Sequence, residues 1–278
     1  MPEGHTLHRL ANALTHAFAG HPVRVCSPQG RFAESAALLD GAELIGCKAY
    51  GKHLLIEFSG ERFVHVHLGL IGAFDIGSGT VEQPRGAVRL RIIGQSAYAD
   101  LRGPNACELW TAPQVDDLAA RLGPDPLRAD ADPERAWRRI ERSRAPIATL
   151  LMDQTVIAGV GNVYRAEVLF RQRIDPFMEG RLLRHREWQA MWRDLCSLMA
   201  EGVRIGRIDT VRPEHEPEAM GREPRVDDHG GEVYVYRRAG DACFVCESRV
   251  RREDHAGRNL FWCPRCQRRT RRTSQNRR

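Results

Sequence analysis

Two closely spaced cysteine pairs near the C-terminal end constrain the fold of this 278-residue chain most strongly. Cys243 and Cys246 form one Cys-x2-Cys pair, and Cys263 and Cys266 form a second after sixteen intervening residues. Each pair can occupy a tight turn that directs both thiolates toward one ion, and two such turns complete a tetrahedral four-sulfur site. The spacing predicts a zinc finger over residues 241–268 with one structural Zn²⁺. Because protein thiolates fill all four positions, we expect no catalytic metal and no organic cofactor.

A disulfide framework is the alternative, and it requires an oxidising compartment. The chain starts MPEGHTLHRL, without the basic-then-apolar order of a secretory signal. It contains no run of about 18 apolar residues, so no membrane span and no membrane partner are expected. These features favour a cytoplasmic protein with reduced thiols.

Basic residues outnumber acidic ones by 42 to 36, which gives a formal net charge of +6. The last eleven residues contain six arginines and no acid, so positive charge is concentrated at one end. A basic balance of this kind favours a polyanionic partner such as nucleic acid. We expect the basic tail 269–278 to be disordered until it meets that partner.

The first part of the chain combines one helix with several strands. Residues 4–19 predict a helix, because apolar residues such as Leu7, Leu14 and Phe18 recur at helical spacing. From residue 44 to about 110 the period changes to that of strands, with turns at Ser59-Gly60 and Gly94-Gln95. The predicted strands are 53–58, 62–68, 87–93 and 96–101. One helix followed by hairpins indicates an α+β or β-sandwich domain over residues 2–120.

The second part of the chain reads as helical. Residues 121–133 are rich in proline and aspartate and predict a linker. Helical patterns then dominate a domain over 134–240 that ends in a long polar loop, 206–232. The predicted helices are 134–142, 146–152, 163–172 and 185–200.

A glycine-rich turn, Gly159-Val160-Gly161, joins two of these helical segments. Glycines allow a tight turn and a close approach to a ligand, and Asn162 is placed to cap the following helix. The N-terminus of a helix binds anions such as a DNA phosphate. A simple connection is the alternative, because such turns are common in helical proteins.

Arg258 lies between the cysteine pairs, near the expected tip of a two-stranded hairpin. A basic tip on a rigid hairpin suits contact with a phosphate backbone. For most arginines of the finger, a solvated surface is the simpler interpretation.

Pro2 becomes a free secondary amine if Met1 is removed. An α-amino group titrates near ~8, so about a tenth of it is unprotonated at neutral pH and can act as a nucleophile. Addition to a sugar C1′ would give an iminium ion, which acidifies the C2′ protons and promotes β-elimination of the 3′-phosphate. Glu3 adjoins this amine and can transfer protons. The tripeptide by itself is equally consistent with a plain helix entry.

Only two lysines occur, Lys48 and Lys52, and Lys52 enters the first strand of a predicted hairpin. It can contact a phosphate beside the reacting sugar. His65 and His67 lie on one face of the next strand and can reach the same site, although packed or hydrogen-bonded histidines are the simpler interpretation.

The segments MPEG, GKHLL, GVGNVYRAEVLF and GRNLFWCPRC occur in this order over nearly the whole chain. Together they resemble the formamidopyrimidine-DNA glycosylase/endonuclease VIII family, and most of all the actinobacterial endonuclease VIII-type enzymes. The resemblance implies a β-sandwich with a long N-terminal helix, then a helix–two-turns–helix domain with a zinc finger. It implies a monomeric bacterial enzyme, associated with the nucleoid, that binds double-stranded DNA containing oxidised bases or abasic sites.

The resemblance also implies the activity, a bifunctional DNA glycosylase and AP lyase that reaches C1′ by flipping the nucleotide. Strand cleavage would proceed by β-elimination or by β,δ-elimination. By this resemblance Pro2 matches the family's Schiff-base nucleophile, Glu3 its acid/base and Lys52 its hairpin lysine. Asn162 and Arg258 match the family's phosphate-binding residues. Leu70, with Ile71 beside it, matches the residue that fills the void left by the flipped base.

Departures from the family pattern bear on the substrate. The loop 100–107 lacks the Arg-x-Phe pair with which formamidopyrimidine-DNA glycosylase probes the opposite strand, and the chain starts MPEG rather than MPELPE. Both favour oxidised pyrimidines as substrates. The alternatives are an oxidised-purine glycosylase of the same fold and a non-catalytic DNA-damage-binding protein, against which Pro2, Glu3 and Lys52 together argue.

Overall fold

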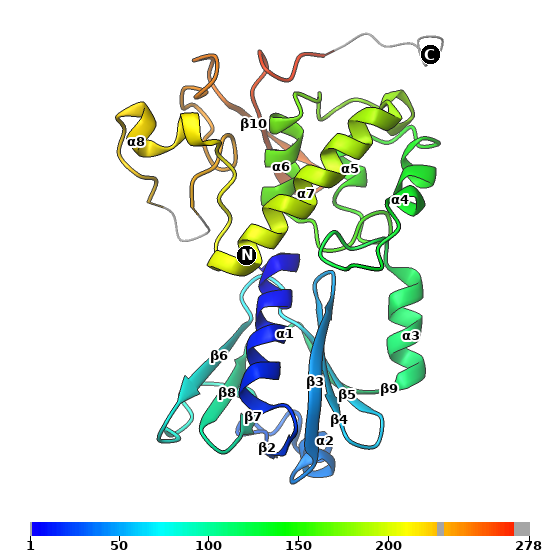
Figure 1. Cartoon of the computed structure of the whole chain (residues 1–278), viewed down its shortest axis with the longest axis vertical. Coiled ribbons are helices and arrows are strands. Elements are labelled where there is room, and N and C mark those ends of the chain that lie inside the picture. The colour runs from blue at the N-terminus through cyan, green and yellow to red at the C-terminus, as the bar shows by residue number, and fades with distance from the viewer. Residues whose placement is uncertain (1, 227–230, 270–278) are drawn as a thin grey trace. The chain divides into compact units, whose positions relative to one another are not determined.

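The helix expected at the start of the chain is present as α1 (Gly4–Phe18), in a computed structural model that describes residues 2–226 and 231–269. Its apolar stripe, which includes Leu7, Leu14 and Phe18, is buried. The helix ends before Gly20, whose positive φ of 80° favours glycine. The chain divides into two compact units, residues 1–121 and 122–278 (Figure 1).

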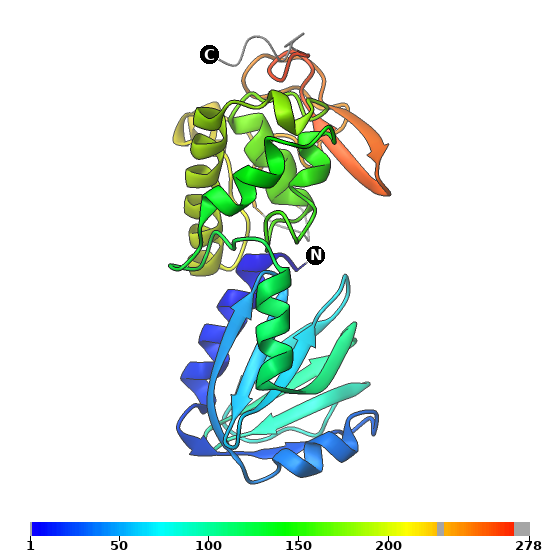
Figure 2. The ribbon, with the colours of Figure 1, turned by 90° about the vertical axis from the view of Figure 1, so that its right-hand side faces the viewer.

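Two antiparallel sheets form the first unit, as Figure 2 shows from the side. One sheet has the order β1-β3-β4-β5-β9 and the other the order β2-β7-β8-β6. Apolar residues of both sheets, such as Ile56 and Ile92, share one core with the stripe of α1. The strands are β1 (His21–Pro22), β2 (Arg24–Cys26), β3 (Glu43–Tyr50), β4 (His53–Phe58), β5 (Arg62–His67), β6 (Ala73–Ser78), β7 (Val88–Ile93), β8 (Ala97–Arg102) and β9 (Ala106–Thr111).

The four strands predicted from the sequence are therefore confirmed to within a residue at each end as β4, β5, β7 and β8. The sequence pattern did not single out β3, β6 and β9, nor the helices α2 (Ala33–Leu39) and α3 (Ala112–Arg121). The burial of β6 and β9 is irregular, with exposed residues on both faces, so neither alternates cleanly. The α+β class and the β-sandwich are confirmed.

Helices form the second unit around a core of its own, and the finger shares that core through Leu260 and Phe261. Of helix α6, only Arg171 is not buried. The elements are α4 (Pro133–Ile140), α5 (Ile147–Leu150), α6 (Asn162–Arg171), η1 (Gly180–Leu182), α7 (His185–Ile205), η2 (Pro213–His215), α8 (Pro217–Met220), β10 (Arg251–His255) and β11 (Arg258–Trp262). In the described part of the chain, none of the helices has the length and hydropathy that crossing a membrane needs.

The segment expected as a linker, 121–133, differs from that expectation at its start. Residues 122–126 are buried. The Gly123 N–H donates to the carbonyl of Gln154 at 2.9 Å, and the Ala158 N–H donates to the carbonyl of Pro124 at 3.0 Å. These bonds pack the start of the segment into the second unit, because proline and aspartate can serve a packed turn as well as a free connection.

Candidate active site and nucleic-acid interface

Pro2 and Glu3 directly precede α1. Pro2 is half-buried, and Glu3 is the N-cap residue with a side chain that is 0% exposed. Its carboxylate does not cap the helix, whereas its carbonyl accepts a hydrogen bond from the Thr6 N–H at 2.9 Å. The first turn contains no other acidic residue. The N-terminal end of the helix dipole therefore favours a negative charge at Glu3.

Lys52 lies in the two-residue turn between β3 and β4, where Tyr50 pairs with His53. Gly51 of the same turn has a positive φ of 57°. The Cys47 N–H donates to Thr15 Oγ1 at 2.9 Å, and the Gly20 N–H donates to the carbonyl of Leu44 at 2.9 Å.

These two bonds show that α1 and β3 run in opposite directions, so the helix begins where the strand ends. Figures 1 and 2 both show the start of α1 and the β3–β4 turn at one end of the unit. The loop after β5 lies at this end too, because β4 begins and β5 ends there. It carries Leu70 and Ile71, which are 59% and 88% exposed. The structure thus gathers Pro2, Glu3, Lys52 and Leu70 at one end of the first unit.

A histidine cluster adjoins Lys52. His53 Nδ1 and His65 Nε2 are 2.9 Å apart, and the ring of His65 stacks on Trp110 at 3.8 Å between centroids. The ring of His67 lies 5.1 Å from that of His53. Burial lowers the pKa of His53 to about 3 and that of His65 to about 4. These two histidines are therefore packed, hydrogen-bonded and neutral at pH 7, and His53 is a member that the sequence pattern did not indicate.

Asn162 begins α6, but its predicted capping role is wrong. Gly161, rather than Asn162, is the N-cap residue, and a glycine has no side chain with which to cap the helix. Asn162 is 4% exposed, and its Nδ2 donates to the backbone carbonyl of Asn259 in β11 at 3.0 Å. Arg165 Nη2 donates to the same carbonyl at 3.1 Å and also to Asn162 Oδ1. Both side chains therefore tie α6 to the finger, a contact with no local sequence signal.

The finger hairpin turns at Ala256 and Gly257, which both have positive φ as a type I′ hairpin turn requires. Arg258 follows this turn, pairs with His255 and is exposed, so it lies at the tip as expected.

The four finger cysteines converge as their spacing predicts. All four Sγ atoms lie within 4.8 Å of one another, with Cys246 and Cys263 3.4 Å apart and Cys243 and Cys266 3.9 Å apart. A tetrahedral site with Zn–S bonds of about 2.3 Å has sulfur atoms about 3.8 Å apart. The cluster fits a structural zinc ion.

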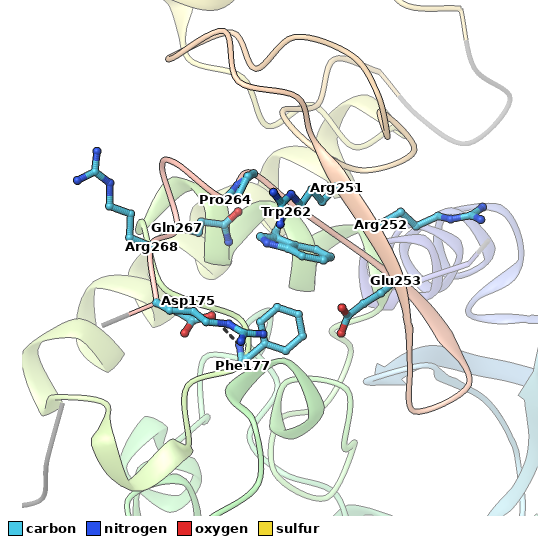
Figure 3. A pocket seen from close by; sticks show the side chains of 10 residues that line it. Asp175, Phe177, Arg251, Arg252, Glu253, Trp262, Pro264, Gln267 and Arg268 are labelled. Atoms are coloured by element: carbon cyan, nitrogen blue, oxygen red, sulfur yellow. Dashed lines mark hydrogen bonds between the residues drawn. The ribbon is translucent and has the colours of Figure 1, made fainter. Parts of the chain in front are cut away.

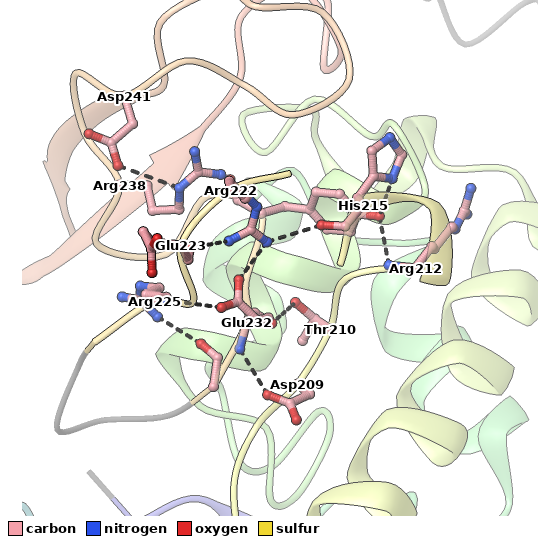
Figure 4. A network of polar contacts seen from close by, with 12 residues as sticks. Asp209, Thr210, Arg212, His215, Arg222, Glu223, Arg225, Glu232, Arg238 and Asp241 are labelled. Carbon is pink, nitrogen blue, oxygen red and sulfur yellow. Dashed lines mark hydrogen bonds and ion pairs between the residues drawn. The ribbon is translucent and has the colours of Figure 1, made fainter. Parts of the chain in front are cut away.

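The polar loop 206–232 contains two short helices and is held by Glu232 (Figure 4). The carboxylate of Glu232 accepts from Arg222 Nη2 at 2.6 Å and from the Arg225 N–H at 2.6 Å. Its own N–H donates to Asp209 Oδ1 at 2.8 Å. Glu232 thus joins the start of the loop, at Asp209, to its later part, at Arg222 and Arg225. Residues 227–230, like Met1 and the tail beyond Arg269, lie outside the described residues.

A two-sheet sandwich, a helical unit and a four-cysteine finger together define the architecture of a helix–two-turns–helix DNA glycosylase. Two family models match the chain: the formamidopyrimidine-DNA glycosylase N-terminal domain over residues 1–107 and the formamidopyrimidine-DNA glycosylase H2TH domain over residues 122–213. The chain belongs to the formamidopyrimidine-DNA glycosylase/endonuclease VIII family and is a DNA glycosylase of base excision repair.

Individual relatives agree with this assignment. The chain is 53% identical over 274 residues to "Endonuclease 8 1" of Mycobacterium tuberculosis, covering 96% of this chain and 100% of the relative. It is 30% identical to the "Formamidopyrimidine-DNA glycosylase" of Chloroflexus aurantiacus, covering 84% and 83%. Its fold is similar to that of the Lactococcus lactis Fpg protein in complex with abasic-site DNA, with a TM-score of 0.77 at 21% identity and coverage of 96% and 100%.

Proposed function

We propose that this chain removes oxidised pyrimidines from double-stranded DNA and cleaves the strand at the same site, with the Pro2 amine as the nucleophile. The observation that carries the proposal is the position of Pro2 directly before a fully buried carboxyl residue, Glu3, at the start of α1. A carboxyl group held next to an amine can move the protons that glycosidic bond cleavage and imine chemistry require.

The proposed reaction begins when the Pro2 nitrogen bonds to C1′ and the bond from C1′ to the base breaks. Glu3 takes the proton that the Pro2 nitrogen loses and passes it to O4′ as the sugar ring opens, which leaves an iminium ion between Pro2 and C1′. Loss of a C2′ proton then supplies the electron pair that expels the 3′-phosphate by β-elimination. Water releases the sugar remnant and restores the amine. Elimination of the second phosphate would extend the reaction to β,δ-cleavage.

Lys52 and Leu70 support this assignment by their position at the same end of the first unit. We propose that Lys52 binds the phosphate beside the lesion and that Leu70 fills the space left by the flipped nucleotide. We assign phosphate contacts on the second unit to Arg258 and to Asn162, whose Nδ2 would exchange its bond to the Asn259 carbonyl for a phosphate oxygen. We assign a structural Zn²⁺ to the four cysteines.

The preference for pyrimidines draws support from the loop 100–107. Its one arginine, Arg102, pairs with Asp75 at 2.7 Å and Asp100 at 2.9 Å, and its Nε donates to the carbonyl of Arg85 at 2.9 Å. A guanidinium committed in this way is poorly suited to probing the opposite strand. The similarity to a relative named endonuclease VIII agrees with this preference. The purine-specific alternative predicts faster release of 8-oxoguanine than of thymine glycol.

Borohydride trapping tests the nucleophile. The enzyme with a free Pro2 is expected to form a covalent adduct with duplex DNA containing an abasic site or thymine glycol. A form with a peptide extension before Pro2 should form none, because its proline nitrogen is an amide. The matched control is the same protein after removal of the extension. Glu3→Gln should keep the adduct with abasic DNA but lose base release. Equal amounts of adduct with and without the extension would exclude Pro2 as the nucleophile.

Replacing Arg258 by Ala tests the proposed phosphate contact. Loss of one such contact should weaken duplex binding for every sequence. It should also make the negative slope of log K against log salt shallower by about 0.9. Arg204→Ala is the matched control, because Arg204 is exposed on α7 and pairs with Glu201. Fluorescence anisotropy at several salt concentrations measures both. An unchanged slope in Arg258→Ala would remove this residue from the interface.

A further inference from the structure

A cavity of about 850 Å³ opens at the base of the finger, where the first strand of the hairpin meets the loop after α6 (Figure 3). We call it the finger-base pocket. Two aromatic rings, Phe177 and Trp262, two carboxylates, Asp175 and Glu253, and several arginines line it. Its volume is in the range of pockets that hold small organic ligands, about 300–1,000 Å³.

The two rings provide a surface for planar groups. Phe177 and Trp262 meet edge to face, with centroids 5.1 Å apart and planes 86° apart, and both are half-buried. The guanidinium of Arg269 lies 5.0 Å from the centroid of Phe177. A face of Phe177 therefore already accepts a planar cation. Nucleobases stack on aromatic rings and on guanidinium planes in the same way.

The pocket carries charges of both signs: two carboxylates and the Arg269 guanidinium lie beside the rings, and two further arginines extend outward. Asp175 is 8% exposed and accepts a hydrogen bond from the Phe177 N–H at 3.1 Å, and Figure 3 shows Glu253 pointing toward the rings. The guanidinium groups of Arg252 and Arg268 extend outward on opposite sides.

This arrangement discriminates between two kinds of anionic partner. Carboxylates beside the rings can accept hydrogen bonds from the amino groups of bases, and arginines at the rim can bind backbone phosphates. An acidic side chain beside the rings would meet Asp175 and Glu253 as like charges and Arg269 as an opposite one, whereas a base brings no net charge to this mixed surface. The chemistry of the pocket therefore matches a nucleotide better than an acidic side chain.

We propose that the finger-base pocket binds an unpaired nucleotide of single-stranded DNA, with its base against Phe177 and Trp262 and its phosphates on Arg252 and Arg268. An unpaired base is required because the bases of a duplex are stacked on one another. The site is separate from Arg258: Arg251 pairs with Trp262 and His255 with Arg258. The strand residues that line the pocket, 251–253, are two to four positions from His255, which is about 7–13 Å at about 3.3 Å per residue.

The binding of an undamaged, labelled oligodeoxycytidylate tests the proposal, with an undamaged duplex of equal length as the comparison. Phe177→Leu keeps an apolar side chain but removes the ring, and it should weaken single-strand binding about tenfold because a base can no longer stack there. The double variant Arg252→Ala, Arg268→Ala should make the negative slope of log K against log salt for the single strand shallower by about 1.4, for two lost contacts. Duplex binding should stay within about twofold in both variants.

Arg258→Ala should give the opposite pattern, with loss on the duplex and little change on the single strand. Arg252 and Arg268 are exposed, so their replacement leaves the core intact, and zinc content and thermal unfolding verify the fold of each variant. Unchanged single-strand affinity in both pocket variants would overturn the proposal, as would equal losses on single strand and duplex. The proposal would also be overturned if the pocket variants lost binding to an acidic, tryptophan-containing peptide but kept their affinity for the single strand. Adduct formation with abasic duplex DNA is read separately, so failure here leaves the proposed reaction intact.

Discussion

At the scale of single residues, the histidine cluster is the clearest case of chemistry set by surroundings. His53 and His65 share a hydrogen bond, and His65 is 4% exposed with Glu108 3.7 Å from its Nδ1. Burial is the main cause of their lowered pKa values, and His67, Arg121 and Lys52 add positive charge around His53. A neutral pair beside Lys52 adds no further positive charge to the proposed phosphate site.

This cluster predicts a loss of stability in acid. The unfolded histidines titrate near 6.5, whereas the folded ones titrate at about 3 and about 4. Between these values the unfolded chain binds more protons, so the free energy of unfolding falls as the pH falls below 6.5. We expect His65→Gln to reduce this fall by about 1–3 kcal/mol. Urea unfolding at about pH 7 and about pH 4.5 measures it. His16→Gln, at an exposed position of α1, is the control, and equal acid sensitivity of wild type and His65→Gln would contradict the assignment.

At the scale of elements, α6 organises the second unit through polar side chains. Its Glu167 is 0% exposed and accepts hydrogen bonds from the N–H groups of residues 234–236 at 2.7–2.9 Å. Thr210 Oγ1 donates to the same carboxylate at 2.6 Å. Asn162 and Arg165 fasten the start of the helix to β11. One helix thus holds the segment leading to the finger and the finger itself.

Asn162→Ala tests this coupling. Asn162 Nδ2 no longer donates to the carbonyl of Asn259, so we expect a loss of about 1–3 kcal/mol in the stability of the second unit. Hydrogen exchange of the β10–β11 amides should accelerate. Asn259→Ala is the matched control, because Asn259 contributes its backbone carbonyl and its side chain is exposed. Identical exchange in wild type and Asn162→Ala would show that other contacts hold the hairpin.

At the scale of the whole molecule, each of the two units has its own hydrophobic core, and the finger cysteines Cys243 and Cys263 belong to the second core. Separate cores favour separate unfolding transitions. A metal that binds only the folded finger should stabilise the unit that contains it.

Zinc removal is therefore expected to act on one unit. Chelation, or Cys263→Ser, should lower the melting temperature of one calorimetric transition by several degrees and leave the other unchanged. The chain should also lose binding to duplex DNA, with about one zinc released per chain. Cys196→Ser is the control, because Cys196 lies on α7 outside the cluster. A uniform shift of both transitions would argue against independent units, and unchanged DNA binding without zinc would argue against a structural role.

Local patterns in the sequence determined much of this protein. Spacing alone placed the four cysteines together, and apolar periodicity located α1 and four strands to within a residue, because both depend on neighbours only a few positions apart. The order of four motifs was enough to identify the family. Pro2, Glu3, Lys52, Leu70, Asn162 and Arg258 as functional residues remain predictions.

Only the tertiary structure decided how distant segments meet. Asn162 and Asn259 are 97 positions apart, and Glu167 and Tyr236 are 69 apart. No local period records such contacts, and for this reason the sequence predicts a helix cap at Asn162 where the structure has a contact with the finger. The finger-base pocket likewise combines residues 175–177 with residues 251–269. A hydrogen bond or a pocket depends on distance in space, and packing of the core brings these segments together.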